Sequence, residues 1–231
     1  MPSPPISVED FARIHGVIRG VLSGQNVPAA DIAKSCVFFA LAGAYLLHRK
    51  HGLNALPVAG AGFVAVSERN DALDILCFAK RDDESGEWCS DTDAFHAWIE
   101  VTTDDERRWI IDLTSPLYPE SIRKQHPASR PGFKAFMRPI GEMLSHPDYF
   151  SEEGVVGDFF MERSKAHTAY MMQRAAKDRQ LGDLVDIAND WYVRAPAPLR
   201  AYLAIRSDDG QVRELRFKPP RLAGLWSSQA S

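Results

Sequence analysis

The sequence predicts an α+β protein in which a helix headed by a cysteine packs on an antiparallel sheet, followed by a helical region and a hairpin. Three observations predict this class. Apolar residues recur at spacings of three and four in residues 8–24, and residues 37–47 form an apolar run of helical length. Four segments rich in Val, Ile, Phe and Trp, separated by polar turns, lie between residues 57 and 113. An Asp-Gly turn near the C-terminus lies between two short apolar segments.

Length and composition favour one globular domain. The chain has 231 residues, of which 45% are hydrophobic and 25% charged, enough apolar material for a sizeable core. We expect a single domain over 1–231, with a core over about 7–120, a loop and helical elaboration over about 121–195, and a C-terminal hairpin over about 200–218. The net charge of −4 argues against a nucleic-acid partner, because no basic excess exists to neutralise phosphates.

The cysteine count and the apolar runs predict the compartment. Cys36, Cys77 and Cys89 are odd in number and widely spaced, which indicates free thiols in a reducing environment. The first residues lack the basic and apolar stretches of a secretory signal. The longest apolar run, residues 37–47, is shorter than the roughly 20 residues that cross a bilayer. We expect a soluble cytoplasmic protein without a membrane partner.

Two helices open the chain. Ser7 begins a capping box and predicts a helix from residue 8, which Gly24 ends. Residues 25–34 predict a loop or short helical turn around Pro28. The second helix is expected over residues 35–49, before Gly52. Because it has almost no polar face, it should lie between other elements.

A sheet is expected next, with strands at residues 57–66, 73–79, 96–101 and 108–113. Short connections predict antiparallel neighbours. If the turn of the last hairpin is centred on the Thr-Asp-Asp-Glu segment, the numbers of paired residues sum to about 208. This register would place His96 nearly opposite Asp112, with both side chains on one face.

The remainder of the chain is predicted less regularly. Six prolines in residues 114–148 predict an irregular, wrapping loop. Helices are expected over residues 156–177 and 181–192. Strands over residues 201–206 and 211–217 would form the terminal hairpin around Gly210.

Three side chains could form a thiol-based catalytic site. Cys36 opens the second helix, where the positive end of the helix dipole favours a thiolate. His96 opens one strand of the hairpin and could hold the thiol proton. Asp112, near the end of the paired strand, could fix the imidazole tautomer and stabilise the imidazolium.

The segments KSCVFFALAGAYLLHRKHGLNALPVAGAGFVAV, AFHAWIEV and WIIDLTSP resemble the transglutaminase-like core of the papain-like superfamily. The similarity covers residues 35–116, about a third of the chain. The resemblance implies a papain-like fold with Cys36 as nucleophile, His96 as base and Asp112 as the orienting carboxylate. The whole chain is also similar to a small bacterial family of uncharacterised function.

The sequence departs from that pattern before the nucleophile. The superfamily usually has Trp or Gly there, where this chain has Lys34 and Ser35. Papain-like enzymes also place an oxyanion-binding Gln about six residues ahead, whereas Gln25 is eleven ahead, with Asn26 beside it. Gln25, Asn26 or Ser35 could contribute to the oxyanion site, or the backbone N–H of Cys36 could bind it instead.

Other residues have different expected roles. Trp98 and Trp109 are expected in the core or in a pocket wall. The spacing of Cys77, Cys89 and His96 fits no standard zinc pattern, so no metal and no cofactor are expected.

The sequence therefore predicts a cysteine-dependent enzyme that acts on a peptide, amide or acyl substrate by way of a thioester. Two alternatives stay open: an inactive binding or scaffold protein with the same fold, and an N-acyltransferase that uses an acyl-coenzyme A donor. The substrate and the oligomeric state do not follow from the sequence.

Overall fold

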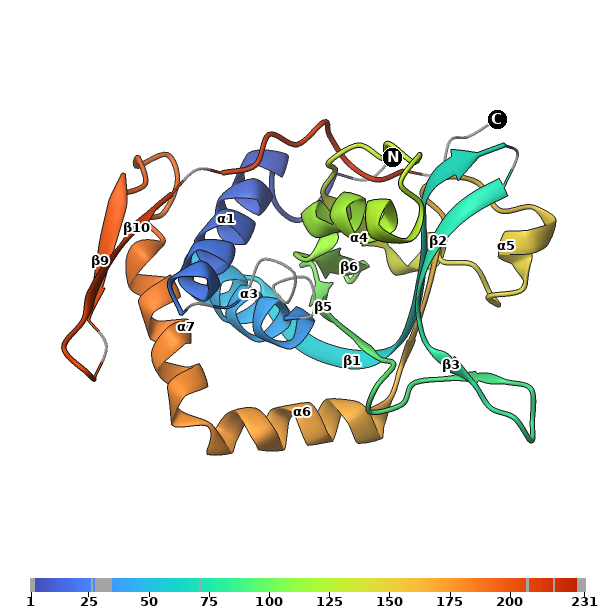
Figure 1. Cartoon of the computed structure of the whole chain (residues 1–231), viewed down its shortest axis with the longest axis horizontal. Coiled ribbons are helices and arrows are strands. Elements are labelled where there is room, and N and C mark those ends of the chain that lie inside the picture. Colours follow the sequence, from blue (N-terminus) through green and yellow to red (C-terminus); the bar gives the residue numbers. More distant parts are fainter. Residues whose placement is uncertain are drawn as a thin grey trace.

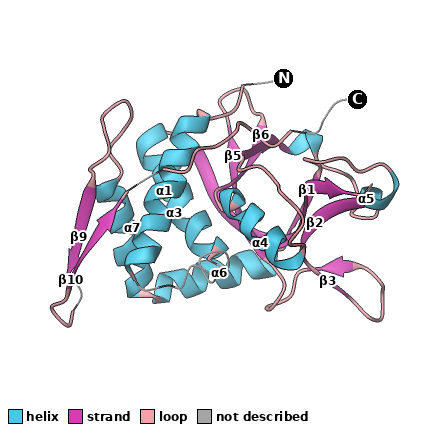
Figure 2. Ribbon diagram, turned by 45° about the horizontal axis from the view of Figure 1, so that its top comes forward, coloured by secondary structure: helices cyan, strands magenta, loops and turns pink. Residues whose placement is uncertain are grey.

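The structure is a computed structural model that describes residues 3–25, 27, 35–70, 72–206, 208–217 and 219–227. It confirms the α+β class. A six-stranded antiparallel sheet curls into a half-barrel, with the helices of residues 8–51 and 165–191 gathered on one side and the two ends of the described chain on another (Figures 1 and 2).

In the described part of the chain, helices occur from the N-terminal to the C-terminal region and the strands form three sheets. The helices are α1 (Val8–Gly24), α3 (Cys36–His51), α4 (Tyr118–Gln125), α5 (Tyr149–Glu152), α6 (Lys165–Lys177) and α7 (Arg179–Trp191), with 3-10 turns η1 (Ser115–Leu117) and η2 (Ile140–Glu142). The main sheet contains β1 (Asn54–Arg69), β2 (Ala72–Phe78), β5 (His96–Thr102), β6 (Arg108–Asp112), β7 (Phe136–Pro139) and β8 (Phe159–Arg163). Two small hairpins are formed by β3 (Lys80–Arg81) with β4 (Trp88–Cys89), and by β9 (Tyr202–Arg206) with β10 (Val212–Arg216).

The long strand β1 organises the sheet. Gly60 pairs with His96 of β5 and, on its other edge, with β8, while Gly62 pairs with Phe78 of β2 and also with β8. Strands β5 and β2 therefore lie end to end along one edge of β1. A Cβ atom on Gly60 would lie 1.9 Å from a carbonyl oxygen of β8, so only glycine permits this close pairing. The end-to-end arrangement brings His96 and Phe78 to one junction.

Each face of the sheet carries its own core, because side chains alternate along a strand. Ile99 and Val101 of β5 pack with the cluster that contains α1, α3 and α7. Trp98 packs on the opposite face, with Tyr118 and Ile122 of α4. Helix α3 contacts α1, α7, β1 and β5, so the prediction that it lies between other elements is confirmed.

The strongest local signals are confirmed. The Ser7 hydroxyl accepts a hydrogen bond from the backbone N–H of Asp10 at 3.0 Å, and α1 follows it. Gly52 ends α3 in the left-handed conformation, with φ of 70°. The four predicted strands of the sheet form as β1, β2, β5 and β6, and the hairpin β9–β10 also forms where the apolar segments predict it. The predicted turn of residues 25–34 lies mostly outside the described residues.

The predicted register of the β5–β6 hairpin is wrong by two positions. Val101 pairs with Trp109, so paired numbers sum to 210 rather than 208. The turn is the reason: Thr103 N–H donates to the Arg107 carbonyl at 3.0 Å, and Glu106 adopts a φ of 62°, so three residues form the loop. A shift of two leaves every side chain on its predicted face.

Two stretches differ from the predicted elements. Residues 114–148 are more regular than an irregular loop, since they contain α4 and β7, and Pro119 occupies the first turn of α4, where its missing N–H costs no helical hydrogen bond. The predicted helix over 156–177 is two elements, β8 and then α6. The Ser164 hydroxyl accepts from the His167 N–H at 3.2 Å and begins α6 there.

The remaining elements enclose the helical side. Helix α6 runs below the sheet and α7 rises from its end toward α1, with the β9–β10 hairpin outside them (Figure 1). Within the described ranges, no helix combines the length and apolarity needed to cross a membrane.

Candidate active site

Cys36 is the first residue of α3. Ser35 is the N-cap, with φ of −87° and ψ of 29°, and Cys36 is 8% exposed. The first N–H groups of a helix have no acceptor within it, and together with the helix dipole they favour negative charge at this position. The fold therefore holds the thiol at the edge of the core, at the N-terminal end of α3.

The structure brings His96 and Asp112 together. His96 Nε2 lies 2.7 Å from Asp112 Oδ2, and the two side chains are 2% and 0% exposed. Extending the observed register sets Asp112 opposite Trp98, so His96 and Asp112 are diagonal neighbours on one face. The long imidazole and the carboxylate span that diagonal.

Every acceptor position of the Asp112 carboxylate is engaged. Oδ1 accepts from the backbone N–H of Thr114 at 2.9 Å and from its hydroxyl, while Oδ2 accepts from His96 and from the Tyr118 hydroxyl. Burial would raise the pKa of Asp112, but the charge of His96 and these hydrogen bonds outweigh burial and lower that pKa. Asp112 is thus held as an anion.

Tyr118 of α4 completes this arrangement. Its hydroxyl donates to Asp112 and lies 3.4 Å from His96 Nε2. Burial, and then the charge of Asp112, raise the pKa of Tyr118 well above 10, so the phenol keeps its proton. Tyr118 therefore fixes the carboxylate that orients the imidazole.

His96 is held in its protonated form. Burial opposes the charge, but the carboxylate of Asp112, with a smaller contribution from the Cys36 thiol, raises the pKa of His96 to about 10. Because Nε2 is bonded to Asp112, Nδ1 is the ring nitrogen left to accept a proton from a thiol. Among the described residues Nδ1 is buried and has no hydrogen-bond partner, and catalytic hydrogen bonds often tighten only when substrate is bound.

The imidazole is also fixed by packing. Phe78 stacks on it, with ring centroids 4.3 Å apart and planes at 18°, and Trp98 lies 6.4 Å away at 25°. A Cβ on Gly62 would be 3.6 Å from the Cβ of His96, so the strand passes directly beneath the ring. The ring has little room to rotate.

The weaker candidates lie in different places. Ser35 is beside Cys36 as the N-cap, Trp98 is near the His96 ring, and Gln25 follows α1, where its N–H bonds to the Leu22 carbonyl. Asn26 lies outside the described residues. Trp109 is buried in the core on the helical side and lines a separate hollow with residues 3–5 and the β5–β6 turn.

Sequence reasoning did not identify Tyr118 or Phe78 as site residues. Tyr118 lies in the stretch interpreted as an irregular loop, although Pro119 at a helix start was a usable signal. Phe78 reaches the site only because β2 and β5 abut on β1. No local pattern indicates that contact.

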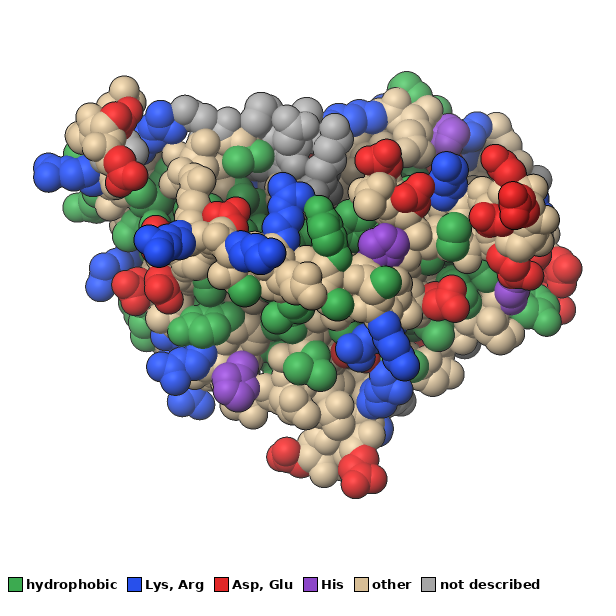
Figure 3. All heavy atoms as spheres, turned by 90° about the horizontal axis from the view of Figure 1, so that it is seen from below, with side chains coloured by type: hydrophobic (Ala, Val, Ile, Leu, Met, Phe, Trp, Pro, Cys, Tyr) green, Lys and Arg blue, Asp and Glu red, His purple; other side chains and the backbone are tan. Residues whose placement is uncertain are grey.

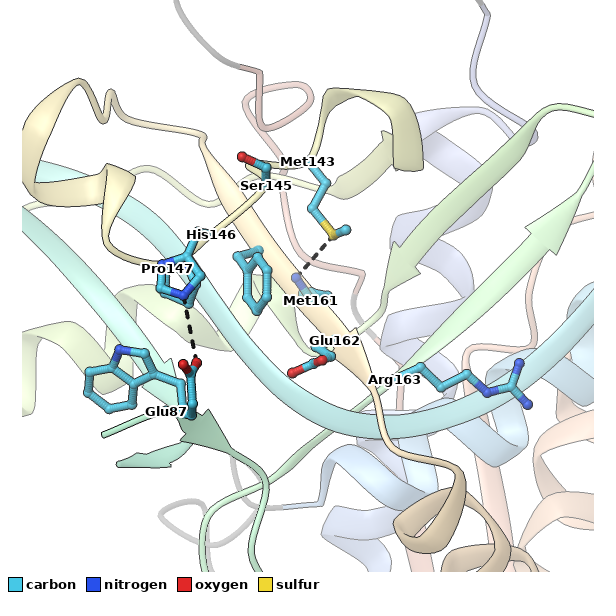
Figure 4. Close-up of a pocket in the computed structure, with 10 residues that line it drawn as sticks. Glu87, Met143, Ser145, His146, Pro147, Met161, Glu162 and Arg163 are labelled. Carbon is cyan, nitrogen blue, oxygen red and sulfur yellow. Dashed lines mark hydrogen bonds and ion pairs between the residues drawn. The ribbon is translucent and has the colours of Figure 1, made fainter. Parts of the chain in front are cut away.

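A cavity of about 420 Å³ lies apart from this site (Figure 4). It is bordered by Met143, His146, Met161 and Glu87, and the His146 ring lies 4.0 Å from the Glu87 carboxylate. None of Cys36, His96 and Asp112 lines it. The described residues include no cluster of three or more metal-ligating side chains.

Comparison with known proteins supports the fold and leaves the activity open. A family described as "Protein of unknown function (DUF2026)" matches residues 7–226. A crystal structure described only as a genomics target is 25% identical, with a TM-score of 0.76 over 98% of this chain and 99% of that chain. No curated protein matches the chain.

Proposed function

The chain belongs to the DUF2026 family, which has no assigned activity, and we propose that it is a cysteine-dependent acyl-transfer or amide-hydrolysing enzyme with a papain-like, transglutaminase-like core. One observation carries the proposal. A buried imidazole bonds to a carboxylate that is saturated with hydrogen bonds, and the Cys36 thiol, at the start of α3, is close enough to contribute to the raised pKa of that imidazole.

The reaction follows from the protonation states. With its proton on His96, Cys36 attacks a carbonyl carbon as a thiolate, and a tetrahedral oxyanion forms. The oxyanion collapses, and the leaving group takes the proton from His96 Nδ1. A thioester on Cys36 remains. Water or an amine then attacks the thioester carbonyl, gives its proton to His96, and releases the acyl product and the thiolate.

The first turn of α3 is suited to the oxyanion. The backbone N–H of Cys36 has no acceptor within the helix and lies beside the nucleophile. Backbone N–H groups aimed at a developing negative charge typically contribute on the order of 10²–10³ in rate. A side-chain donor from Gln25 is not required by this arrangement.

A second candidate function is an inactive binding protein, favoured by the 8% exposure of Cys36. The two are separated by iodoacetamide labelling of the wild type and of a C77S/C89S variant at about pH 6, where an ordinary thiol of pKa about 8.5 is almost fully protonated. Burial raises the pKa of Cys77, so that thiol should react slowly although it is exposed.

The enzyme proposal expects Cys36 to alkylate about 10- to 100-fold faster than Cys77 or Cys89, by peptide mass analysis. H96N should remove this advantage. A folded protein whose Cys36 resists alkylation would support the binding protein instead. In a parallel incubation with acetyl-coenzyme A, an acetyl adduct on Cys36 would identify an acyl-coenzyme A donor, and its absence would count against that variant of the reaction.

A further inference from the structure

A groove of about 500 Å³ lies where the first turn of α3 meets the start of β5 and the face of α6. Ser35 and Val37, on either side of Cys36 in the chain, line it. Phe95, which precedes His96, also lines it. Neither Cys36 nor His96 lines the groove, but Cys36 belongs to the same apolar cluster as the lining residues Phe38 and Met171, so the groove adjoins the nucleophile.

The walls of the groove are mainly apolar. Phe38 and Met171 are 4% and 3% exposed and form its floor, while Tyr170 is 54% exposed at its rim. On the same face of the molecule, apolar side chains are exposed among Lys and Arg side chains (Figure 3). The volume lies within the roughly 300–1,000 Å³ of small-molecule sites.

Several polar groups of the groove are already bonded to other groups of the protein. Asp178 caps α7 by accepting from the Leu181 N–H at 3.2 Å. His167 is 2.7 Å from the Ser90 hydroxyl and stacks on Phe95 at 5.9 Å. Of the other charged lining residues, Asp93 and Arg174 have opposite signs, so the groove has no strong preference for an ion.

We propose that this groove, called the acyl groove below, binds the substrate by a neutral apolar group, aliphatic or aromatic, attached to the reacting carbonyl. The inference rests on the proposed function, because it takes Cys36 as the nucleophile. Burying such a group against Phe38, Phe95 and Met171 orients the carbonyl toward the first turn of α3. Acyl donors with a large apolar group then react faster than acetyl donors.

Ala175 offers a way to block the acyl groove from an accessible helix position. It lies one turn after Met171 on α6 and lines the groove, whereas its neighbour Ala176 is exposed and does not. A175W would fill the groove, and A176W is the matched control. Y170A alters the exposed rim and leaves the core untouched.

The test is acylation of Cys36 by p-nitrophenyl acetate and by p-nitrophenyl 3-phenylpropanoate, followed by p-nitrophenolate release and by the mass of the thioester. In the wild type and in A176W, the phenylpropanoyl ester should react about 10- to 100-fold faster than the acetyl ester, since the buried ring adds apolar area. A175W should lose this preference, whereas A176W, outside the groove, should keep the wild-type rate with both esters. Y170A should reduce the preference several-fold.

Two outcomes separate this inference from the proposed function. If both esters acylate Cys36 and the preference is the same in the wild type, A175W and Y170A, the acyl groove is wrong and the nucleophile stands. If neither ester acylates Cys36 in the folded wild type, the proposed function fails and the inference fails with it.

Discussion

Two buried histidines on opposite faces of the sheet have opposite charge preferences. His15, 0% exposed on α1, lies with Nδ1 2.7 Å from the Leu113 carbonyl oxygen, and burial lowers its pKa to about 4. His96 is also buried. It bonds to the carboxylate of Asp112, the residue before Leu113, and the pKa of His96 is raised to about 10. Burial alone favours the neutral ring, and only a full negative charge reverses it.

The neighbours of each ring explain what it can do. His15 stacks on Phe39 at 5.3 Å, and its Nε2 is buried without a partner, so it serves as a neutral donor to one carbonyl. His96 bonds to an anion through Nε2, and the Cys36 thiol also helps to raise its pKa. A buried imidazole becomes a proton carrier only where a second ionisable group shares its proton.

The largest effect on Cys36 acylation is expected when the negative charge beside His96 is removed, because His96 is then buried without an anion, as His15 is. D112N keeps the shape of the partner and removes its charge, so burial should lower the pKa of His96 and leave the thiol without a base. We expect Cys36 acylation to fall on the order of 10³- to 10⁴-fold. The measurement is p-nitrophenolate release by the purified variant.

The matched control for D112N is D74N. Asp74 is also a buried carboxylate of the same sheet, bonded to Ser67 at 2.6 Å and Ser129 at 2.5 Å, but it has no nucleophile beside it. D74N should retain the acylation rate while losing stability. Unchanged acylation in D112N would remove Asp112 from the mechanism.

The second effect is a change in the free energy of unfolding with pH, which follows from the lowered pKa of His15. Its pKa is about 4 in the folded state and about 6.5 when unfolded, so its stabilisation is present above pH 6.5 and is lost as the pH falls toward 4. The lost free energy of unfolding is about 3 kcal/mol, at about 1.4 kcal/mol for each pKa unit. For His96 the sign is opposite, because the stabilisation is present below pH 6.5 and is lost as the pH rises through about 10.

H15N tests this sign. The amide can still donate to the Leu113 carbonyl but does not titrate. Urea unfolding at about pH 7 and about pH 4 should show a smaller loss of stability in H15N than in the wild type. H146N, on an exposed histidine, should resemble the wild type. Equal losses in all three proteins would contradict the assignment to His15.

The smallest effect is expected from Y118F. This change removes one hydrogen bond to Asp112, typically about 1 kcal/mol, and leaves the ring in its core. We expect kcat to fall about 5- to 10-fold with KM unchanged, since Tyr118 acts through Asp112 and touches no substrate. Y149F, on an exposed tyrosine, is the control. A change in KM alone would point to a binding role instead.

Local signals in the sequence predicted much of the fold. The caps at Ser7, through its hydroxyl, and at Gly52, through its backbone, bond only to residues a few positions away, so the boundaries of α1 and α3 could be inferred from a few residues. The segments near Pro119 and Ser164 carried similar signals, but prolines and a continuous apolar pattern obscured them. Those two stretches contain α4, β7 and β8, which were missed, as were the short elements α5, β3 and β4 elsewhere.

By itself, the sequence determined which side chains head which elements: Cys36 on a helix start, and His96 and Asp112 on neighbouring strands. Only the tertiary structure decided their final partners. The β5–β6 register depends on a three-residue loop, Phe78 meets His96 because two strands share one edge of β1, and Tyr118 arrives from a helix across the core. The physical reason is that periodicity reports which face a residue occupies, whereas contacts between distant segments depend on how whole elements pack.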